Sequence, residues 1–448
     1  MDNTSRIILL LAAAAVAAPL RAQDAVQGGA RWTLRRCIDH ALEHNISIRQ
    51  SENQKRQRDL QLQTDRWSRS PAVEASLGQN FSFGRGLTED NTYTNTNTSS
   101  TSFSVGASMP LFTGMRITNS VRLSRINLAA ATADLEKARN DVSVQVAEAY
   151  VQVLYDTEIA VVARRQVSVD SMQTARLEAM MAAGKAAPAE VAQQRAAQAQ
   201  SELTAVQADN SRRLSLLALS QLLELPSPDG FDIVRPDTAA MPDGGAVPSP
   251  EAVFAEAVGL KPEVRAERLR LEGAVLSVKV AQSAYYPQLS LSAGLGTDYY
   301  KTSGFKAADF RTQLRNNFSQ YVGLSLSVPL FNRLQTRNSV RSARIDRETQ
   351  QLALENVKKQ LYKEIQTACH NAVAARAKYA SSRAAMESGE EAFRLATAKY
   401  ESGKASITEF NEAKNNWLKA QSDMLQARYE CLYQTALVDF YRGRGLDF

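Results

Sequence analysis

The sequence is poor in the residues that build disulfide frameworks and metal centres. Among its 448 residues there are three cysteines and three histidines. Cys37, Cys369 and Cys431 show no CxxC spacing, so we expect buried thiols and no disulfide framework. His40 and His44 stand one helical turn apart, but no HExxH pattern is present, which predicts a polar helix face and no metal site.

Long hydrophobic runs are missing after the N-terminus. Arg6 precedes an almost wholly apolar stretch, IILLLAAAAVAAPL, and the small residue Ala22 follows it closely. This pattern predicts a cleaved secretory signal peptide over residues 1–22. No later run reaches the roughly eighteen apolar residues of a membrane helix. We therefore exclude a helical membrane protein and expect an exported chain that meets a membrane only through strands.

Charge clusters and catalytic motifs are also absent. The net charge of +6 is spread thinly and forms no basic run, so a nucleic-acid partner is not expected. The sequence contains no nucleophile elbow, no P-loop and no dinucleotide-binding fingerprint. We therefore predict that the protein is not an enzyme and needs no cofactor.

What the chain does contain is an internal repeat. The stretch SMPLFTGMRITNSVRLSRI begins at Ser108, and SVPLFNRLQTRNSVRSARI begins 219 positions later at Ser327. The same offset relates Gly184 to Gly403. We therefore predict two copies of one unit of about 190 residues.

The repeat sets the expected domain organisation. Residues 23–225 form the first repeat, residues 251–448 form the second, and the segment 226–250, rich in proline and glycine, is the linker. Each repeat is expected to hold a helix, a strand pair and a long helical hairpin. The strand pairs are placed over 72–112 and 288–331, and the hairpin tips near residues 184 and 403.

The predicted strands alternate apolar and small polar residues. Val73, Ala75 and Leu77 alternate in this way. The pattern is typical of transmembrane barrel strands, although a half-buried antiparallel sheet shows it too. Four strands cannot close a barrel, because the smallest bacterial barrels have about eight, and lipid does not tolerate an open edge. The chain must then oligomerise, with eight strands from two copies or twelve from three.

Long segments without proline follow the strands. Residues 113–183 could form a helix about 105 Å long at 1.5 Å per residue. A seven-residue series through this segment is apolar except at Asp156 and Asp170, which suits coiled-coil-like packing. The second repeat offers an equivalent segment over 332–402. We expect shorter helices to lie along the long ones, over 34–70, 188–225, 250–283 and 406–441.

In these features the sequence resembles the TolC-like outer-membrane efflux proteins. The resemblance covers nearly all of the mature chain and includes strand pairs ending in PLF and the tips AAGKAAPAEV and ESGKASITEF. It implies a mixed α and β fold: a homotrimer with a twelve-stranded transmembrane β-barrel, continued by a coiled α-helical barrel in the periplasm. It implies passive export through the outer membrane, driven by an inner-membrane transporter through a periplasmic adaptor, in efflux or type I secretion.

The resemblance assigns roles to residues at the tips. Gly184, Lys185, Gly403 and Lys404 are implied to dock on the adaptor. Glycine there would also supply the left-handed turn that ends each long helix. The arginine expected two residues after the second glycine is Ala405 here. We therefore expect that Lys404 or Lys185 could replace it in an ionic latch.

The resemblance also implies a closed periplasmic entrance held by polar residues. Tyr400, Glu409, Glu412 and Glu190 occupy the matching positions, with Glu where the family pattern has Asp. Two of these acids have an alternative role. Ser406 and Glu409 have the spacing of a capping box, and Glu190 suits the first turn of a helix. Capping and gating therefore both stay open for them. In a trimer, Glu409 and Glu412 would place six carboxylates near one constriction, which favours cations.

Two other classes of protein share part of this pattern. A structural or adhesive coiled-coil surface protein would have similar long helices, and an exported enzyme could use them as a scaffold. The missing catalytic cluster disfavours the enzyme. We take the export duct as the leading prediction.

Overall fold

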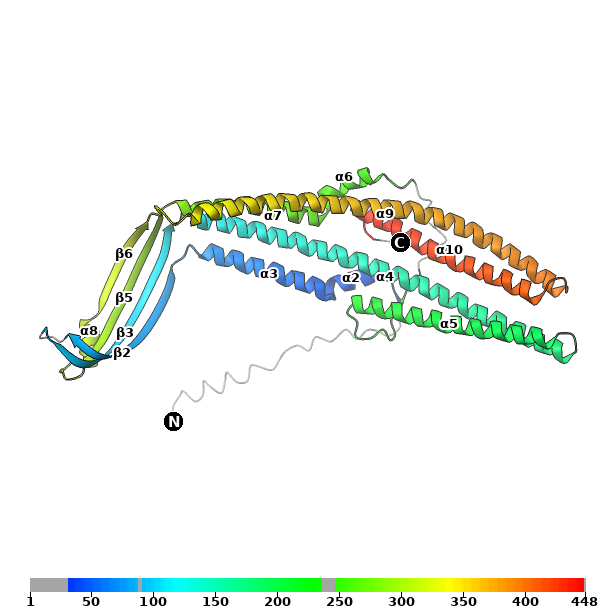
Figure 1. Cartoon of the computed structure of the whole chain (residues 1–448), viewed down its shortest axis with the longest axis horizontal. Helices are drawn as coiled ribbons and strands as arrows, with labels where there is room; N and C mark the ends of the chain where they lie inside the picture. The colour runs from blue at the N-terminus through cyan, green and yellow to red at the C-terminus, as the bar shows by residue number, and fades with distance from the viewer. Residues whose placement is uncertain (1–30, 88–90, 236–245, 447–448) are drawn as a thin grey trace, which may run out of the picture. The chain divides into compact units, whose positions relative to one another are not determined.

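The computed structural model describes residues 31–87, 91–235 and 246–446 (Figure 1). The signal peptide predicted over residues 1–22 lies outside the described residues. In the described part of the chain, no helix combines the length and the hydropathy that crossing a bilayer requires.

The chain divides into two compact units. Among the described residues, the smaller unit comprises 31–37 and 149–235, and the larger unit comprises 38–87, 91–148 and 246–446. The helix α4 (Arg116–Ala182) begins in the larger unit and ends in the smaller one.

The larger unit contains a four-stranded antiparallel sheet (Figure 1). Its strands pair in the order β2-β3-β5-β6. Pairing between β3 and β5 joins two hairpins that are far apart in the sequence, which the repeat alone did not predict. The strands are β2 (Ala72–Leu87), β3 (Tyr93–Phe112), β5 (Gln288–Thr302) and β6 (Ser319–Ser327).

The strand register gathers apolar side chains on one face of the sheet. Val73 pairs with Ala107, Ala107 with Ala293, and Ala293 with Val322, so one apolar row crosses all four strands. The adjacent rows belong to the other face, because side chains alternate along a strand. That face is rich in serine and glycine, and the Ser76 hydroxyl lies 2.7 Å from a serine hydroxyl of β3.

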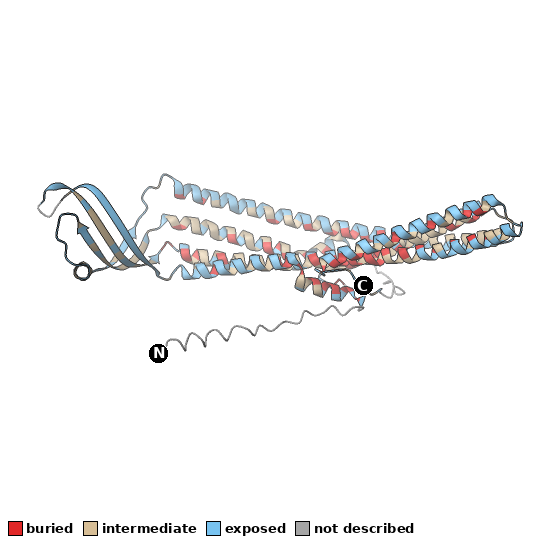
Figure 2. Ribbon diagram, turned by 90° about the horizontal axis from the view of Figure 1, so that it is seen from below, coloured by how far each residue is buried: buried red, intermediate tan, exposed pale blue. Residues whose placement is uncertain are grey.

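No strand residue of this sheet whose exposure is described is buried, and Figure 2 shows the strands in pale blue and tan. Val73 is 70% exposed and Val322 is 77% exposed. The apolar face of the sheet therefore has no cover within one chain.

The connection between β5 and β6 contains a short helix that the sequence did not predict. This helix is α8 (Phe310–Asn316), and the Asp309 side chain caps it by accepting from the Thr312 amide at 3.2 Å.

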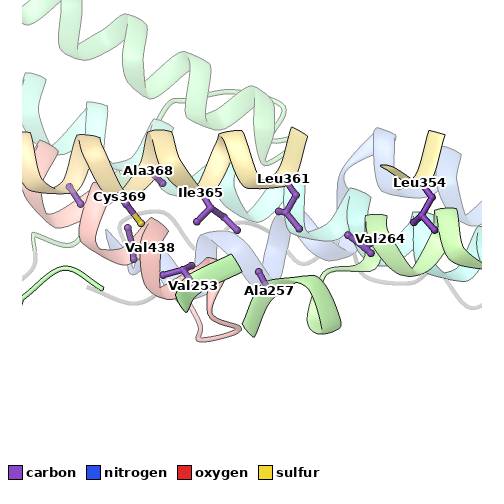
Figure 3. Close-up of a cluster of buried hydrophobic side chains, with 10 residues drawn as sticks. Val253, Ala257, Val264, Leu354, Leu361, Ile365, Ala368, Cys369 and Val438 are labelled. Atoms are coloured by element: carbon purple, nitrogen blue, oxygen red, sulfur yellow. The ribbon is translucent and has the colours of Figure 1, made fainter. Parts of the chain in front are cut away.

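Two long helices form a hairpin in the larger unit. They are α9 (Gln335–Glu401) and α10 (Ile407–Tyr441). Two shorter helices, α6 (Pro250–Leu260) and α7 (Pro262–Gln282), pack on α9. Figure 3 shows the buried cluster that joins these elements. Its labelled members are Val253, Ala257, Val264, Leu354, Leu361, Ile365, Ala368, Cys369 and Val438.

The helix expected over 250–283 is in fact broken at Lys261. Pro262 starts α7, and its ring clashes sterically with a helical conformation of Lys261, so Lys261 adopts an extended conformation. The Lys261 ammonium is buried and donates to the backbone carbonyl of Phe440 at 3.0 Å. It also lies 3.6 Å from the centroid of the Phe440 ring. Burial lowers the pKa of Lys261 to about 8.

The helix expected over 34–70 is broken as well. It forms α2 (Leu34–His44) and α3 (Ile46–Trp67), separated by Asn45. The Asn45 side chain accepts a hydrogen bond from the Ser47 amide at 2.9 Å, so it starts α3 as an N-cap. Asparagine competes with helical backbone bonding in this way, which explains the break.

The smaller unit pairs the end of α4 with α5 (Pro188–Leu222). Asp156 and Asp170, the two exceptions in the apolar series, are both buried. Each accepts from a glutamine four residues earlier on α4, at 3.0 Å and 2.8 Å respectively. The buried carboxylates are therefore hydrogen-bonded, as burial of a polar group requires.

The smaller unit also contains two short strands that the sequence did not predict. The strand β1 (Arg31–Trp32) pairs in parallel with β4 (Asp232–Ile233), which lies in the predicted linker. The Tyr150 hydroxyl lies 3.2 Å from the Trp32 carbonyl and 2.5 Å from the Val234 carbonyl. These contacts anchor part of the linker to α4.

All three cysteines lie among the described residues, and each is free and buried, as predicted. Burial raises the pKa of the Cys37 thiol to about 12 and also raises the pKa values of Cys369 and Cys431. Protonated, buried thiols are poor nucleophiles and poor metal ligands.

Candidate functional site

The second hairpin tip, between α9 and α10, holds Gly403 and Lys404. Gly403 has a φ of +71°. Its amide donates to the Tyr400 carbonyl at 3.0 Å, and the Lys404 amide donates to the Lys399 carbonyl at 2.8 Å. These bonds close the last turn of α9 and require a left-handed residue, so backbone geometry explains the glycine.

The first hairpin tip, between α4 and α5, repeats this geometry. Gly184 has a φ of +68°, and its amide donates to the Met181 carbonyl at 2.9 Å. The Lys185 amide donates to the Met180 carbonyl at 2.8 Å. A Cβ atom added to Gly184 or Gly403 would meet nothing within 4 Å. Glycine is therefore needed for its φ and not for close packing.

The predicted capping box at the start of α10 is confirmed. The Glu409 amide donates to the Ser406 hydroxyl at 3.2 Å, and the Ser406 amide donates to Glu409 Oε2 at 3.2 Å. Glu190 lies in the first turn of α5, after Pro188, and the N-cap residue Ala187 makes no side-chain cap. A carboxylate there stabilises the helix N-terminus through the helix dipole.

The other predicted tip residues are unpaired within the described part of one chain. Lys185, Lys404 and Glu412 are exposed, and neither they nor Glu190 make a side-chain hydrogen bond or ion pair with a described residue. An ionic latch between a lysine and a carboxylate is therefore not formed there. The replacement of the family's arginine by Lys404 or Lys185 stays a prediction.

Tyr400 belongs to an aromatic ladder that the sequence analysis missed. The Tyr400 ring centroid lies 5.2 Å from that of Phe410, and the Phe410 centroid lies 5.6 Å from that of Phe393. The Phe393 ring stacks on Trp417 at 5.2 Å, with the planes 10° apart. Both helices place their two aromatic residues seven positions apart, a spacing that could have revealed the ladder.

The first hairpin has a buried polar group where the second has aromatic rings. Asp170 accepts from Gln166 Nε2 at 2.8 Å and lies 3.4 Å from Gln194 Nε2. Gln194 is fully buried, and its Oε1 has no hydrogen-bond partner among the described residues. The two tips therefore share their turn geometry but differ in their cores. The residues 219 positions before the ladder are Thr174, Met181, Val191 and Gln198.

The described residues offer no candidate metal centre. No group of three or more His, Cys, Asp or Glu side chains in residues 31–87, 91–235 and 246–446 is arranged to hold a metal ion. The rings of His40 and His44 stack on each other, with centroids 4.2 Å apart. His44 Nδ1 also lies 3.0 Å from the His40 carbonyl oxygen.

The fold is shared with known outer-membrane proteins. The chain matches the structure of the CmeC outer membrane channel of Campylobacter jejuni with a TM-score of 0.76, at 19% identity, over 93% of this chain and 86% of that one. It matches the outer membrane protein VceC of Vibrio cholerae with a TM-score of 0.74, at 19% identity, over 92% and 97% of the two chains.

Similarity in sequence points the same way. The chain is 26% identical to the cobalt-zinc-cadmium resistance protein CzcC of Cupriavidus metallidurans, over 72% of this chain and 74% of that protein. It is 25% identical to the protein CyaE of Bordetella pertussis, over 86% and 78% of the two proteins. A family model described as "Outer membrane efflux protein" matches residues 37–224 and 253–442. The chain therefore belongs to the outer membrane efflux protein family, whose members are export channels of the outer membrane.

Proposed function

We propose that three copies of this chain form a passive export duct across the outer membrane. The observation that carries the proposal is the four-stranded sheet, whose edge strands β2 and β6 have no second neighbour in the described chain. Its apolar face is exposed in one chain, although exposed apolar area of this extent is costly in water. Lipid would cover that face, and neighbouring copies would pair with both edges.

Closure of the sheet sets the expected oligomer. Four strands per chain give twelve strands in a trimer, within the range of known bacterial barrels. The apolar row through Val73 and Val322 would face lipid, and the face that bears Ser76 would line the lumen. We infer that the chain is built from two structural repeats, each contributing one strand pair and one long helical hairpin.

The helices would continue the duct in the periplasm. The helices α4 and α9 contain 67 residues each, and α5 and α10 contain 35 residues each. We propose that the tips at Gly184 and Gly403 meet a periplasmic adaptor, which links the duct to an inner-membrane transporter. Lys185 and Lys404 are exposed beside these turns and are therefore available for polar contacts.

We assign no catalytic step to the chain, because a duct needs none. The energy for export would come from the inner-membrane transporter, and cargo selection would belong to that partner too. A relative named for metal resistance is similar to this chain, which agrees with a role in export.

The proposal is tested with the purified mature chain. We expect oligomers that resist mild heating in detergent and discrete single-channel conductance in planar bilayers. Cysteines introduced into β2 and β6 should form crosslinks between copies that connect three chains. A chain that stays in the soluble fraction and conducts no ions would contradict the duct and favour a structural or adhesive surface protein.

A further inference from the structure

A basic pocket lies at the junction between the sheet and the helices of the larger unit. Its volume is about 820 Å³, and it is lined by the end of β3, the start of α4, the end of α7 and the start of α9. One wall is held by a close approach at Gly114. A Cβ atom there would lie 2.5 Å from the Ser283 carbonyl oxygen and 2.7 Å from Tyr286 Cβ, and φ is +60°.

Four cationic side chains line this pocket. Arg337, Arg341 and Arg344 are spaced four and three residues apart on α9, so they share one face of the helix. Lys279 lines the pocket from the last turn of α7. None of the four makes a hydrogen bond or ion pair with a described residue, and no carboxylate lines the pocket. Four like charges without a counter-charge call for an anionic partner.

Apolar and aromatic side chains surround these charges. Phe112, Met115 and Tyr286 line the pocket, and each is more than two-fifths exposed. A ligand that matches this lining has both a negatively charged head group and a hydrocarbon part.

We propose that this pocket binds the phosphodiester of an anionic glycerophospholipid in the inner leaflet of the outer membrane. The inference rests on the proposed function, in which the sheet crosses the membrane and the helices enter the periplasm. The end of the sheet then lies at the inner membrane–water boundary, where basic clusters attract anionic lipids and tyrosine rings lie at the head-group level. The guanidinium groups would donate to the phosphate oxygens, and the exposed apolar side chains would contact the acyl chains.

A lipid explains the site better than a free phosphate ion does. Free phosphate would bind the cations but would leave the exposed apolar side chains of Phe112 and Met115, which line the same pocket, without a partner. The pocket volume also falls in the range of sites that enclose small organic ligands, roughly 300–1,000 Å³. A bound lipid would hold the first turns of α9 against the end of α7 and so fix where the helices leave the membrane.

The test measures lipid binding to the full-length mature protein in detergent by native mass spectrometry. The probes are dioleoylphosphatidylglycerol, dioleoylphosphatidylcholine and glycerol 3-phosphate. We expect the wild type to retain phosphatidylglycerol in preference to phosphatidylcholine. The variant Arg341→Gln/Arg344→Gln should bind phosphatidylglycerol about 25-fold more weakly, since each cation near a membrane surface contributes about five-fold. Lys279→Gln, on another helix, should lose about five-fold.

The matched control is Arg347→Gln/Lys359→Gln. Both residues are exposed on the same helix and do not line the pocket. The control substitutions remove the same amount of positive charge as Arg341→Gln/Arg344→Gln, so phosphatidylglycerol binding should be unchanged. Equal phosphatidylglycerol binding by the wild type and the Arg341→Gln/Arg344→Gln variant would overturn the proposal. Equal affinity of the wild type for phosphatidylglycerol and phosphatidylcholine would also overturn the proposal. That result is expected if a second copy of the chain covers the pocket. Displacement of phosphatidylglycerol by equimolar glycerol 3-phosphate would show that the pocket binds soluble phosphate groups without need of acyl chains, and would overturn the proposal of a lipid site.

Single-channel conductance of the same preparations separates this inference from the proposed function. Wild-type protein that conducts but shows no lipid preference would overturn only the lipid site. Wild-type protein that forms neither oligomers nor channels would overturn the duct and the lipid site together. Circular dichroism of each variant checks that its helices are retained.

Discussion

The ring of Tyr400 lies 5.2 Å from the ring of Phe410, so the last turn of α9 is packed on the first turn of α10. This contact gives the tip of the second hairpin a fixed geometry. It also gives Tyr400 a packing role besides the gating role that the resemblance implies, and suitable variants can separate the two.

Removing the Phe410 ring should loosen the second tip. Phe410 is buried between Tyr400 and Phe393, so Phe410→Ala should cost about 3–5 kcal/mol of local stability. Hydrogen exchange across α9 and α10 near the tip should then accelerate. Val191→Ala alters the matching position of the first hairpin, which has no ladder, and should cost less. Equal exchange rates in wild type and Phe410→Ala would show that the ladder adds no rigidity.

The gating hypothesis predicts an effect of charge at Glu409. Glu409→Gln retains a side chain that can close the capping box, whereas Glu409→Ala removes both the charge and the cap. Gating by the carboxylate predicts higher conductance for both variants, with the largest rise when either is combined with Tyr400→Phe. Capping alone predicts unchanged conductance and a loss of about 1 kcal/mol for the alanine variant only. Single-channel recording and thermal unfolding measure the two effects.

Substitution of the tip glycines should impair pairing with the adaptor more than folding. Gly403→Asn retains a residue that tolerates left-handed backbone, while Gly403→Val does not. Open space around the added Cβ limits the cost to the backbone strain, about 1–2 kcal/mol for Val. Crosslinking to the adaptor in cells should fall for Gly184→Val and Gly403→Val. Normal crosslinking and normal export by the Gly184→Val/Gly403→Val double variant would show that the tips do not dock on the adaptor.

The stability of the larger unit should depend on pH through Lys261. Its pKa in the folded state is about 8, below the ordinary lysine pKa of 10.5, because burial disfavours the charged form. Below pH 8 Lys261 is charged in both the folded and the unfolded state. Above pH 8 it loses its proton in the folded state first, so the free energy of unfolding rises with pH. Three carboxylates act against the burial effect: Glu263, Asp141 and Glu364.

Comparison with Lys261→Met isolates this group. Relative to the variant, the wild type should gain on the order of 1 kcal/mol between pH 7 and pH 9. The thiol of Cys37 and the phenol of Tyr433 titrate in both proteins, so their contributions cancel. Thermal midpoints measured across this range give the difference. A difference that stays constant with pH would show that Lys261 keeps its charge when folded.

The sequence predicted the local features of the tips because they depend on neighbouring residues. The left-handed turn at Gly403 and the capping box at Ser406 and Glu409 involve residues at most five positions apart. The period of two in the strands likewise reports which side chains share a face. Such signals need no knowledge of the rest of the chain.

The missed features depend on residues that meet only after folding. The break at Lys261 is stabilised by Phe440, and β1 pairs with β4 about 200 residues later. The basic pocket combines four elements of the chain, so no single stretch predicts it. Pro262 was a local signal for the break, but the helical composition on both sides concealed it.

The register of the sheet has a consequence for biogenesis. Val105 pairs with Leu295, 190 positions further along the chain. A polypeptide threaded through the inner membrane from its N-terminus therefore delivers β3 well before its partner strand β5 reaches the periplasm. During that interval β3 presents open hydrogen-bonding groups beside apolar side chains, a combination prone to aggregation. We therefore expect the nascent chain to depend on a chaperone that shields β3 until the second half has been translocated.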